Sequence, residues 1–236
     1  MLLYEDFQET GQIQVTLFTP SFIFSTSEIL KMLMELEPEL FNGDPFILPL
    51  PDDAPHEIPR ITLESKDKRY KIEVAPARVN FFRNKIKEED KVIPNEFFQA
   101  AAKTLTSLLA NIGAKCGGIA AIINRFSYKD YPGREIVLQF CKDNFMTEPL
   151  DRPSEFELHS LKKYSFLESF KVNSWVRIKS AKIKSKNGVF RPAVIAHQDI
   201  NTLAEETITY MSEEIFSFYE KICNEFDEIL RLYFPK

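Results

Sequence analysis

Apolar and polar residues alternate over several short stretches in the first third of the chain, and this alternation predicts β-strands. In Gln12–Thr19, the residues Ile13, Val15 and Leu17 alternate with polar neighbours, as expected for a strand that is buried on one face. Three further stretches alternate in the same way and are joined by short turns: Arg60–Ser65, Tyr70–Val74 and Arg78–Arg83. Short strands at this spacing predict an antiparallel meander.

Helical periodicity marks one segment on each side of this meander. Ser25 and Glu28 have the spacing of a capping box, so we expect a helix that begins at Ser25 and ends at Glu37, before a proline. After Asn95, the expected N-cap of a second helix, apolar residues recur at steps of three and four up to Gly113. A glycine is expected just beyond a helix end, because it adopts the left-handed conformation without strain.

The second half repeats the plan of strands followed by a helix. Ile119–Phe126 is almost continuously apolar and Glu135–Cys141 alternates, so both are predicted to be strands. We expect Asn173–Ser185 and Val189–His197 to pair as a hairpin. Its turn is predicted at residues 186–188, because Asn-Gly favours tight hairpin turns.

A long amphipathic helix is predicted at the C-terminal end. Thr202 and Glu205 have the spacing of a second capping box, and apolar residues recur at steps of three and four up to Tyr233. This apolar face is larger than one small sheet would cover, so we expect part of it to contact a second copy of the chain. The candidate interface residues are Ile215, Phe218, Ile222, Phe226 and Ile229.

These patterns predict an α+β protein: antiparallel β-meanders backed by helices, with a long C-terminal amphipathic helix that packs across the sheet or against a second copy. Each half is expected to be a sheet followed by a helix. The expected division is residues 1–116 and 117–236, or one continuous domain over both. The two halves share a plan but show no residue-level repeat.

Composition and charge narrow the classes of function. The chain has 236 residues, of which 44% are hydrophobic, and a formal net charge of -5, so it forms a packed core and does not bind polyanions over its whole surface. Its first residues lack the basic and apolar regions of a signal peptide, and no apolar run approaches the roughly 18 residues of a membrane span. We therefore expect a cytoplasmic protein with no membrane partner.

The charge is unevenly distributed. Between Ser160 and Pro192 the sequence has nine Lys or Arg residues and one acidic residue. Within the predicted hairpin, the candidates for contact with nucleic acid or an acidic partner are Arg177, Lys179, Lys182, Lys184, Lys186 and Arg191. A β-bulge after Ser180 would place them on a single face, where they could contact phosphates. They could equally protect a strand edge from pairing, or contact the acidic C-terminal helix.

Catalytic and metal-binding patterns are weak. The three cysteines form no closely spaced pair, so neither a disulfide framework nor a zinc site is expected, and no cofactor-binding motif is found. His197 and Asp199 lie on the same side of a predicted strand and could share a ligand, although such an aspartate more often organises a turn. Arg125 interrupts an apolar strand, where it could anchor a carboxylate or line a cleft.

Several short phrases of the sequence together suggest a family. They are Leu50-Pro51, Glu57–Leu63, Ser65–Asp67, Tyr70–Ile72, Arg78–Phe82, Gly118-Ile119, Ile123–Phe126 and Asp199–Asn201. In these phrases, and over most of its length, the chain resembles a sporadically distributed family of uncharacterised prokaryotic proteins. The resemblance implies a cytoplasmic prokaryotic protein and assigns no catalytic residue.

Three functional hypotheses follow. The first is a non-catalytic protein-interaction or oligomerisation protein that forms a homo-oligomer or binds a protein partner. The second is a nucleic-acid-binding protein that uses the basic hairpin at residues 177–191. The third is an enzyme of unknown class with a site near His197 and Asp199, which requires these side chains and Arg125 to converge on one cleft.

Overall fold

The computed structural model describes residues 2–20, 24–51, 53–141, 155–184, 189–206 and 208–235. They form a nine-stranded antiparallel sheet in the order β2-β3-β4-β5-β1-β6-β9-β8-β7. The strands are β1 (Glu9–Phe18), β2 (Phe46–Ile47), β3 (Ile61–Glu64), β4 (Tyr70–Ala75), β5 (Arg78–Asn84), β6 (Gly118–Tyr128), β7 (Glu157–Phe166), β8 (Phe170–Lys184) and β9 (Phe190–Thr202). The helices are a short 3₁₀ turn η1 (Tyr4–Phe7), α1 (Thr26–Leu36), α2 (Pro94–Asn111), α3 (Pro132–Cys141) and α5 (Ser212–Tyr233). The predicted α+β class with a long C-terminal helix is confirmed.

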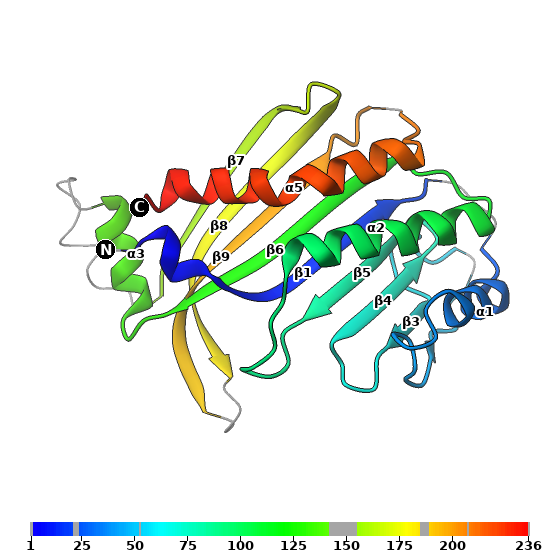
Figure 1. Ribbon diagram of the computed structural model, residues 1–236, viewed down its shortest axis with the longest axis horizontal. Coiled ribbons are helices and arrows are strands. Elements are labelled where there is room, and N and C mark those ends of the chain that lie inside the picture. The colour runs from blue at the N-terminus through cyan, green and yellow to red at the C-terminus, as the bar shows by residue number, and fades with distance from the viewer. Residues whose placement is uncertain are drawn as a thin grey trace.

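The two halves of the sheet have matching topology. In the first half, β1 pairs with β5 and the meander continues outward through β4 and β3; in the second half, β6 pairs with β9 and continues outward through β8 and β7. Each half ends in a long helix, α2 or α5, and these helices lie side by side (Figure 1). The halves are joined at the centre, where β1 and β6 pair antiparallel from Phe18 and Gly118 onward. One sheet therefore runs across the boundary expected at residue 116.

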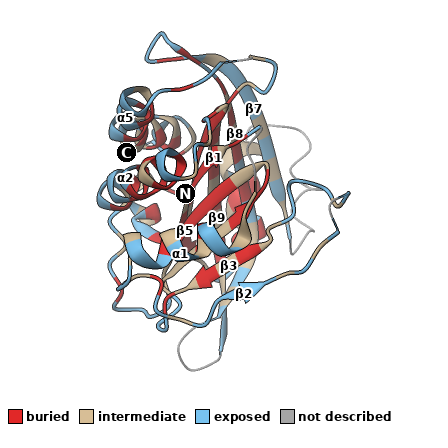
Figure 2. Ribbon diagram, turned by 90° about the vertical axis from the view of Figure 1, so that its right-hand side faces the viewer, coloured by how far each residue is buried: buried red, intermediate tan, exposed pale blue. Residues whose placement is uncertain are grey.

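All the described helices cover the same face of this sheet. Figure 2 shows α1, α2 and α5 on one side of the strands, and the other side carries no described helix. Strand alternation explains the difference, because odd-numbered residues of β1 such as Ile13 and Val15 are buried in the main core, whereas Gln12 and Gln14 face away from the helices. A second, smaller core lies under η1, α3 and the end of α5.

Polar contacts as well as apolar packing attach α5 to the sheet. The buried Tyr219 hydroxyl donates a hydrogen bond to the Ala120 carbonyl of β6 at 2.9 Å, and the Thr16 carbonyl of β1 lies 3.2 Å away. Arg125 of β6 forms an ion pair with Asp227 at 2.6 Å, so it anchors a carboxylate of α5, one of the two roles predicted for it. The same helix thus holds both strands of the central pair.

The five residues predicted to form an oligomer interface lie inside the chain. Ile215, Phe218, Ile222 and Phe226 are buried against the sheet and α2, and Ile229 is partly buried against the same cores. The two meanders join into one wide sheet, which covers more of this stripe than the single small sheet expected from the sequence. An oligomer built on these side chains would require α5 to leave the sheet.

Several local predictions need correction. Thr202 ends β9 and accepts a hydrogen bond from the Ile119 backbone, so it does not cap a helix; α5 begins ten residues later, where Glu214 accepts the Met211 N–H. The stretch predicted as a strand around Cys141 is α3, in which Ile136 and Val137 are buried together as on one helix face. Only two of the three alternating apolar residues, Ile136 and Phe140, lie on the packed side of this helix, and Leu138 is exposed, so three alternating positions were too short a pattern to fix the period.

The ends of the first two helices differ in detail from the prediction. Ser25 is the N-cap of α1, but its side chain makes no capping hydrogen bond. Helix α2 begins at Pro94 and not after Asn95, since proline is favoured in the first helical turn, where its missing N–H costs no hydrogen bond. Gly113 has a φ of 65°, as its predicted position beyond the helix end requires. The hairpin of β8 and β9 is confirmed, while its predicted turn at residues 186–188 lies outside the described residues.

Phe218 provides a direct test of this packing. Its ring contacts those of Phe166, Phe170 and Tyr219, and the side chain has no exposed area. We expect Phe218→Ala to lower the free energy of unfolding by about 3–5 kcal/mol, because it removes buried surface and leaves a cavity. Urea denaturation measures the change. The control Leu232→Ala, at a helix position that is 82% exposed, should change stability by less than about 0.5 kcal/mol.

Candidate functional site: the uncovered sheet face

A row of polar residues crosses the face of the sheet that no described helix covers. Strand register places them opposite one another on six adjacent strands, from β7 to β5: His159, Arg177, His197, Asn124, Gln12 and Asn84. Six polar side chains in a row do not contribute to a hydrophobic core, so this row marks the face as a candidate binding surface. We call this surface the uncovered face.

Hydrogen bonds link four members of the row in one direction. His197 Nδ1 lies 2.6 Å from Asn124 Oδ1, Asn124 Nδ2 donates to Gln12 Oε1 at 3.3 Å, and Gln12 Nε2 donates to Asn84 Oδ1 at 2.8 Å. Because Asn124 offers its oxygen to the imidazole, Nδ1 of His197 carries the proton. Burial, helped by Arg177, lowers the pKa of His197 despite the nearby Asp199, so the ring is neutral at pH 7. The row is therefore uncharged and fixed in orientation between His197 and Asn84.

Asp199 lies beside this row and lacks a cationic partner among the described residues. Its carboxylate accepts a hydrogen bond from Asn201 Nδ2 at 2.9 Å, and Asn173 Nδ2 donates in turn to Asn201 Oδ1. Burial raises the pKa of Asp199, while the Asn201 hydrogen bond, His197 and the nearby charge of Arg177 oppose that shift. His197 and Asp199 share the uncovered face, as predicted, but Asp199 belongs to a strand and does not organise a turn.

Two guanidinium groups on the uncovered face lie over aromatic rings. Arg177 lies 5.6 Å from the ring centre of Trp175, and Arg191 lies 3.9 Å from that of Tyr128. Trp175 is the single tryptophan of the chain, and both rings are half-buried. Such pairs present flat surfaces that combine positive charge with a π-system.

The structure divides the predicted basic hairpin between the two faces. β8 and β9 stay in one continuous register from Val172 to Lys184, without the expected bulge. Arg177, Lys179 and Arg191 therefore lie on the uncovered face, whereas Lys182 and Lys184 have the opposite register, and Lys186 lies outside the described residues. Because β8 has no bulge, its basic residues before Ser180 and those after Ala181 point to opposite faces of the sheet.

Basic side chains outnumber acidic ones on the half of the uncovered face formed by β6–β9. By register, this half carries Lys163, Lys171, Arg177, Lys179 and Arg191 against Glu157 and Asp199. Of these, Arg177, Lys179 and Arg191 form no ion pair with any described residue, whereas Lys171 binds Glu206 at 2.8 Å. A chain of net negative charge thus has a locally positive surface, formed away from the acidic α5.

A cavity of about 670 Å³ opens at one end of the uncovered face. Gln12 and Asn124 from the polar row line it, together with side chains from β8, β9 and the loop that follows β5. The apolar and aromatic part of the lining is Ile86, Phe126, Tyr128, Ile183 and Ile195, and the charged part is Glu9, Lys85, Lys87, Glu88, Arg125, Lys179 and Lys184, so Arg125 lines a cleft as well as binding Asp227. This volume lies within the range of small-molecule sites, about 300–1,000 Å³. We call it the Lys85 cavity.

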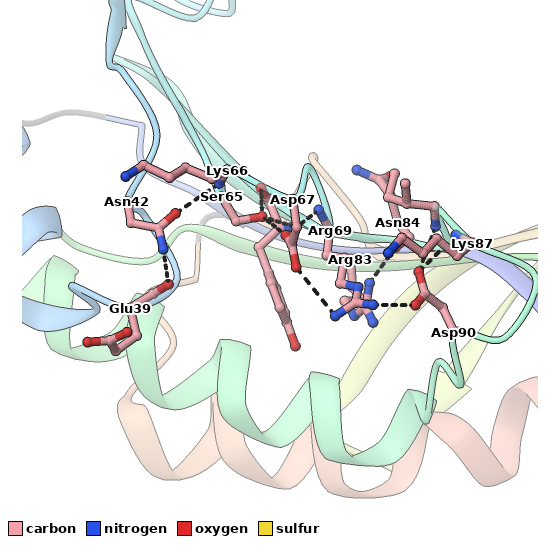
Figure 3. Close-up of polar contacts among 12 residues, drawn as sticks. Glu39, Asn42, Ser65, Lys66, Asp67, Arg69, Arg83, Asn84, Lys87 and Asp90 are labelled. Carbon is pink, nitrogen blue, oxygen red and sulfur yellow. Dashed lines mark hydrogen bonds and ion pairs between the residues drawn. The ribbon is translucent and has the colours of Figure 1, made fainter.

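Asp90 fixes the loop that forms one wall of the Lys85 cavity (Figure 3). One carboxylate oxygen accepts the backbone N–H groups of Ile86 and Lys87 at 3.1 and 2.9 Å, and the other binds Arg69 at 2.5 Å. Burial acts to raise the pKa of Asp90, but these hydrogen bonds outweigh it and lower the pKa to about 2. At neutral pH the carboxylate is charged, and the loop is held in one conformation.

The predicted enzyme site does not assemble. Arg125 points to the helix-covered face, where it binds Asp227, while His197 and Asp199 lie on the opposite face. Within the part of the chain that the structure describes, no three His, Cys, Asp or Glu side chains gather as metal ligands. Burial raises the pKa of Cys116 and Cys223 to about 12, so both thiols are protonated at neutral pH. The convergence that the third hypothesis requires is absent.

The sequence analysis missed Gln12, Asn84 and Trp175 as parts of a site. Each lies at a half-buried strand position on the side away from the main core, and such positions served only to identify strands in the sequence. The signal for Gln12 and Asn84 was the presence of amide side chains at strand positions, where Asn is depleted, and the signal for Trp175 was that it is the single tryptophan of the chain. Their register across six strands could not be deduced without the pairing order.

In comparisons with known proteins, no protein-family model matches the chain and no curated protein matches it. Among the described residues, no helix has the length and apolar character to cross a membrane.

Asp199 is expected to lower the stability of the fold at neutral pH. Its raised pKa means that the folded state disfavours the carboxylate, so Asp199→Asn should increase the free energy of unfolding at pH 7. The gain should be smaller at pH 4 than at pH 7, because burial makes the folded protein take up a proton on Asp199 at a higher pH than the unfolded chain does. Urea denaturation at both pH values measures this. Asp44→Asn, at an exposed position, should leave stability unchanged, and an equal gain there would contradict the argument.

Proposed function

We propose that this chain is a non-catalytic binding protein whose uncovered face takes up single-stranded nucleic acid. The observation that carries the proposal is the pairing of guanidinium groups with aromatic rings on that face, Arg177 with Trp175 and Arg191 with Tyr128. Nucleic-acid bases stack on aromatic side chains and on arginine planes, and phosphates bind cations. Both kinds of contact are available on the same strands.

Single strands fit this surface better than duplexes. Stacking on Trp175 or Tyr128 needs an exposed base face, which a duplex hides inside its helix. The half-buried rings lie on either side of the polar row, Trp175 opposite Asp199 and Tyr128 opposite Ala193, and the amides of that row can donate and accept hydrogen bonds at base edges. The uncovered face therefore offers stacking, hydrogen bonding and charge together.

The charge distribution favours one orientation of binding. Exposed acidic residues such as Glu213, Glu220 and Glu228 lie on α5, on the other side of the sheet. A polyanion is repelled from that side and attracted to the unpaired Arg177 and Lys179. The hypotheses of a protein partner and a homo-oligomer have less support, because the apolar stripe that suggested them is internal.

The test uses charge changes on opposite faces of the same strands. In Arg177→Gln/Lys179→Gln, two cations are removed from the uncovered face; in the matched control Lys162→Gln/Lys182→Gln, two are removed from the other face of β7 and β8. Binding to oligo-dT is followed by Trp175 fluorescence at several salt concentrations. We expect the first variant to bind more weakly and to lower the slope of log K against log salt by about 1.4.

The control should behave like the unchanged protein. Absence of binding to oligo-dT at low salt, or equal losses in both variants, would contradict the proposal. A poly-glutamate peptide that quenches Trp175 as strongly as oligo-dT would also contradict it, because such a peptide has charge without bases and would indicate an acidic protein partner.

A further inference from the structure

We infer that the Lys85 cavity is a nucleotide pocket that receives one nucleoside 5′-phosphate unit of a bound strand. This inference rests on the proposed function. It adds the position at which one base of the bound strand leaves the sheet surface, enters a pocket and is recognised. The cavity opens from the polar row, because Gln12 and Asn124 belong to both. A strand lying along the uncovered face therefore reaches the cavity without crossing a helix.

The hydrogen-bonding groups of the cavity are suited to a base edge. Asn124 uses one amide hydrogen on Gln12 and one oxygen lone pair on His197. Gln12 uses one amide hydrogen on Asn84 and one lone pair on Asn124. Each amide thus keeps one donor and one acceptor position, the combination with which Asn and Gln recognise adenine. Because the row fixes both amides, they do not reorient when the base binds.

The apolar lining is suited to the flat faces of a base. Phe126 and Tyr128 form part of the wall, and isoleucines at positions 86, 183 and 195 form the rest of its apolar lining. Gly11, at the bulge in β1, permits the Phe126 ring to approach the strand, since a Cβ there would lie 3.3 Å from the ring. An aromatic ring and aliphatic side chains around two amides describe a site for a planar, hydrogen-bonding ligand.

The charged groups of the cavity favour a phosphate. Lys85 binds Glu9 at 2.5 Å, so these two charges neutralise each other. Lys87 and Lys179 form no ion pair with any described residue and lie on different walls, one on the loop after β5 and one on β8. A phosphate between them would gain charge-assisted hydrogen bonds. Glu88 also lines the cavity, but Lys87, Lys179 and Lys184 outnumber it, so a cationic ligand would meet a net positive charge.

The wall that carries Lys87 is preorganised. Asp90 holds the backbone of Ile86 and Lys87, and the Lys85 N–H donates to the Gly11 carbonyl at 2.8 Å. The loop is therefore fixed to β1 on one side and to Arg69 on the other (Figure 3). Binding does not have to order it, which lowers the entropic cost.

The experiment follows isoleucine methyl signals by NMR while adenosine 5′-monophosphate is added to the full chain. We expect the methyl signals of Ile86, Ile183 and Ile195 to shift, and those of the core residues Ile29 and Ile72 to stay in place. Adenosine without phosphate should bind more weakly. Lys87→Gln should weaken binding of the nucleotide about tenfold. The matched control Lys91→Gln, on the same loop but outside the cavity, should not.

The results separate this inference from the proposed function. Oligo-dT binding that depends on Arg177, which lies outside the cavity lining, with no methyl shift at the three isoleucines for any nucleotide or oligonucleotide, would overturn the pocket and leave the function standing. Methyl shifts that are equal for Lys87→Gln and Lys91→Gln would also overturn it. Nucleotide binding in the cavity without any oligonucleotide binding would support a nucleotide site and contradict the proposed function.

Discussion

A single sheet with helices on only one face constrains everything else in this protein. The covered face must be apolar, and its strands supply Ile13, Val15 and their neighbours to one core. Tyr219 and Asp227 of α5 then hold β6 from that side, with Tyr219 also close to β1, so the centre of the sheet cannot move independently of the helix. The other face is free to carry polar groups, provided that they satisfy one another.

The polar row meets that condition. Gln12, Asn84, Asn124 and His197 exchange hydrogen bonds across four strands, so half-buried amides keep partners without an external ligand. Asp199 accepts a hydrogen bond from a neutral amide and forms no ion pair within the described chain, and its raised pKa is the basis for expecting it to lower stability at neutral pH. The row links the aromatic and cationic strands β8 and β9 to the cavity beside β5. This continuity is why one bound strand could use both.

Local patterns predicted the covered face well and the uncovered face poorly. The alternation of Ile13, Val15 and Leu17 identified β1 and its buried side, since burial leaves a periodic mark in the sequence. The same pattern could not show that β1 pairs with both β5 and β6, because strand order depends on contacts distant in sequence. For this reason the sequence left open whether the apolar stripe of α5 packs on the sheet or against a second copy, and the structure places it on the sheet. Arg177 and Lys179 were identified by charge, whereas Gln12 and Asn84 acquire a role only through register.

The central claim is that ligand binds the uncovered face, and ultraviolet cross-linking of oligo-uridine followed by mass spectrometry tests it most directly. Aromatic side chains next to a stacked base form cross-links, so the account predicts modified peptides that contain Trp175 and Tyr128. Both residues lie on the uncovered face, while Phe216 is exposed on α5 on the opposite side. Cross-links confined to the peptide that contains Phe216, or none at either ring of the uncovered face when the oligonucleotide is bound, would contradict the account.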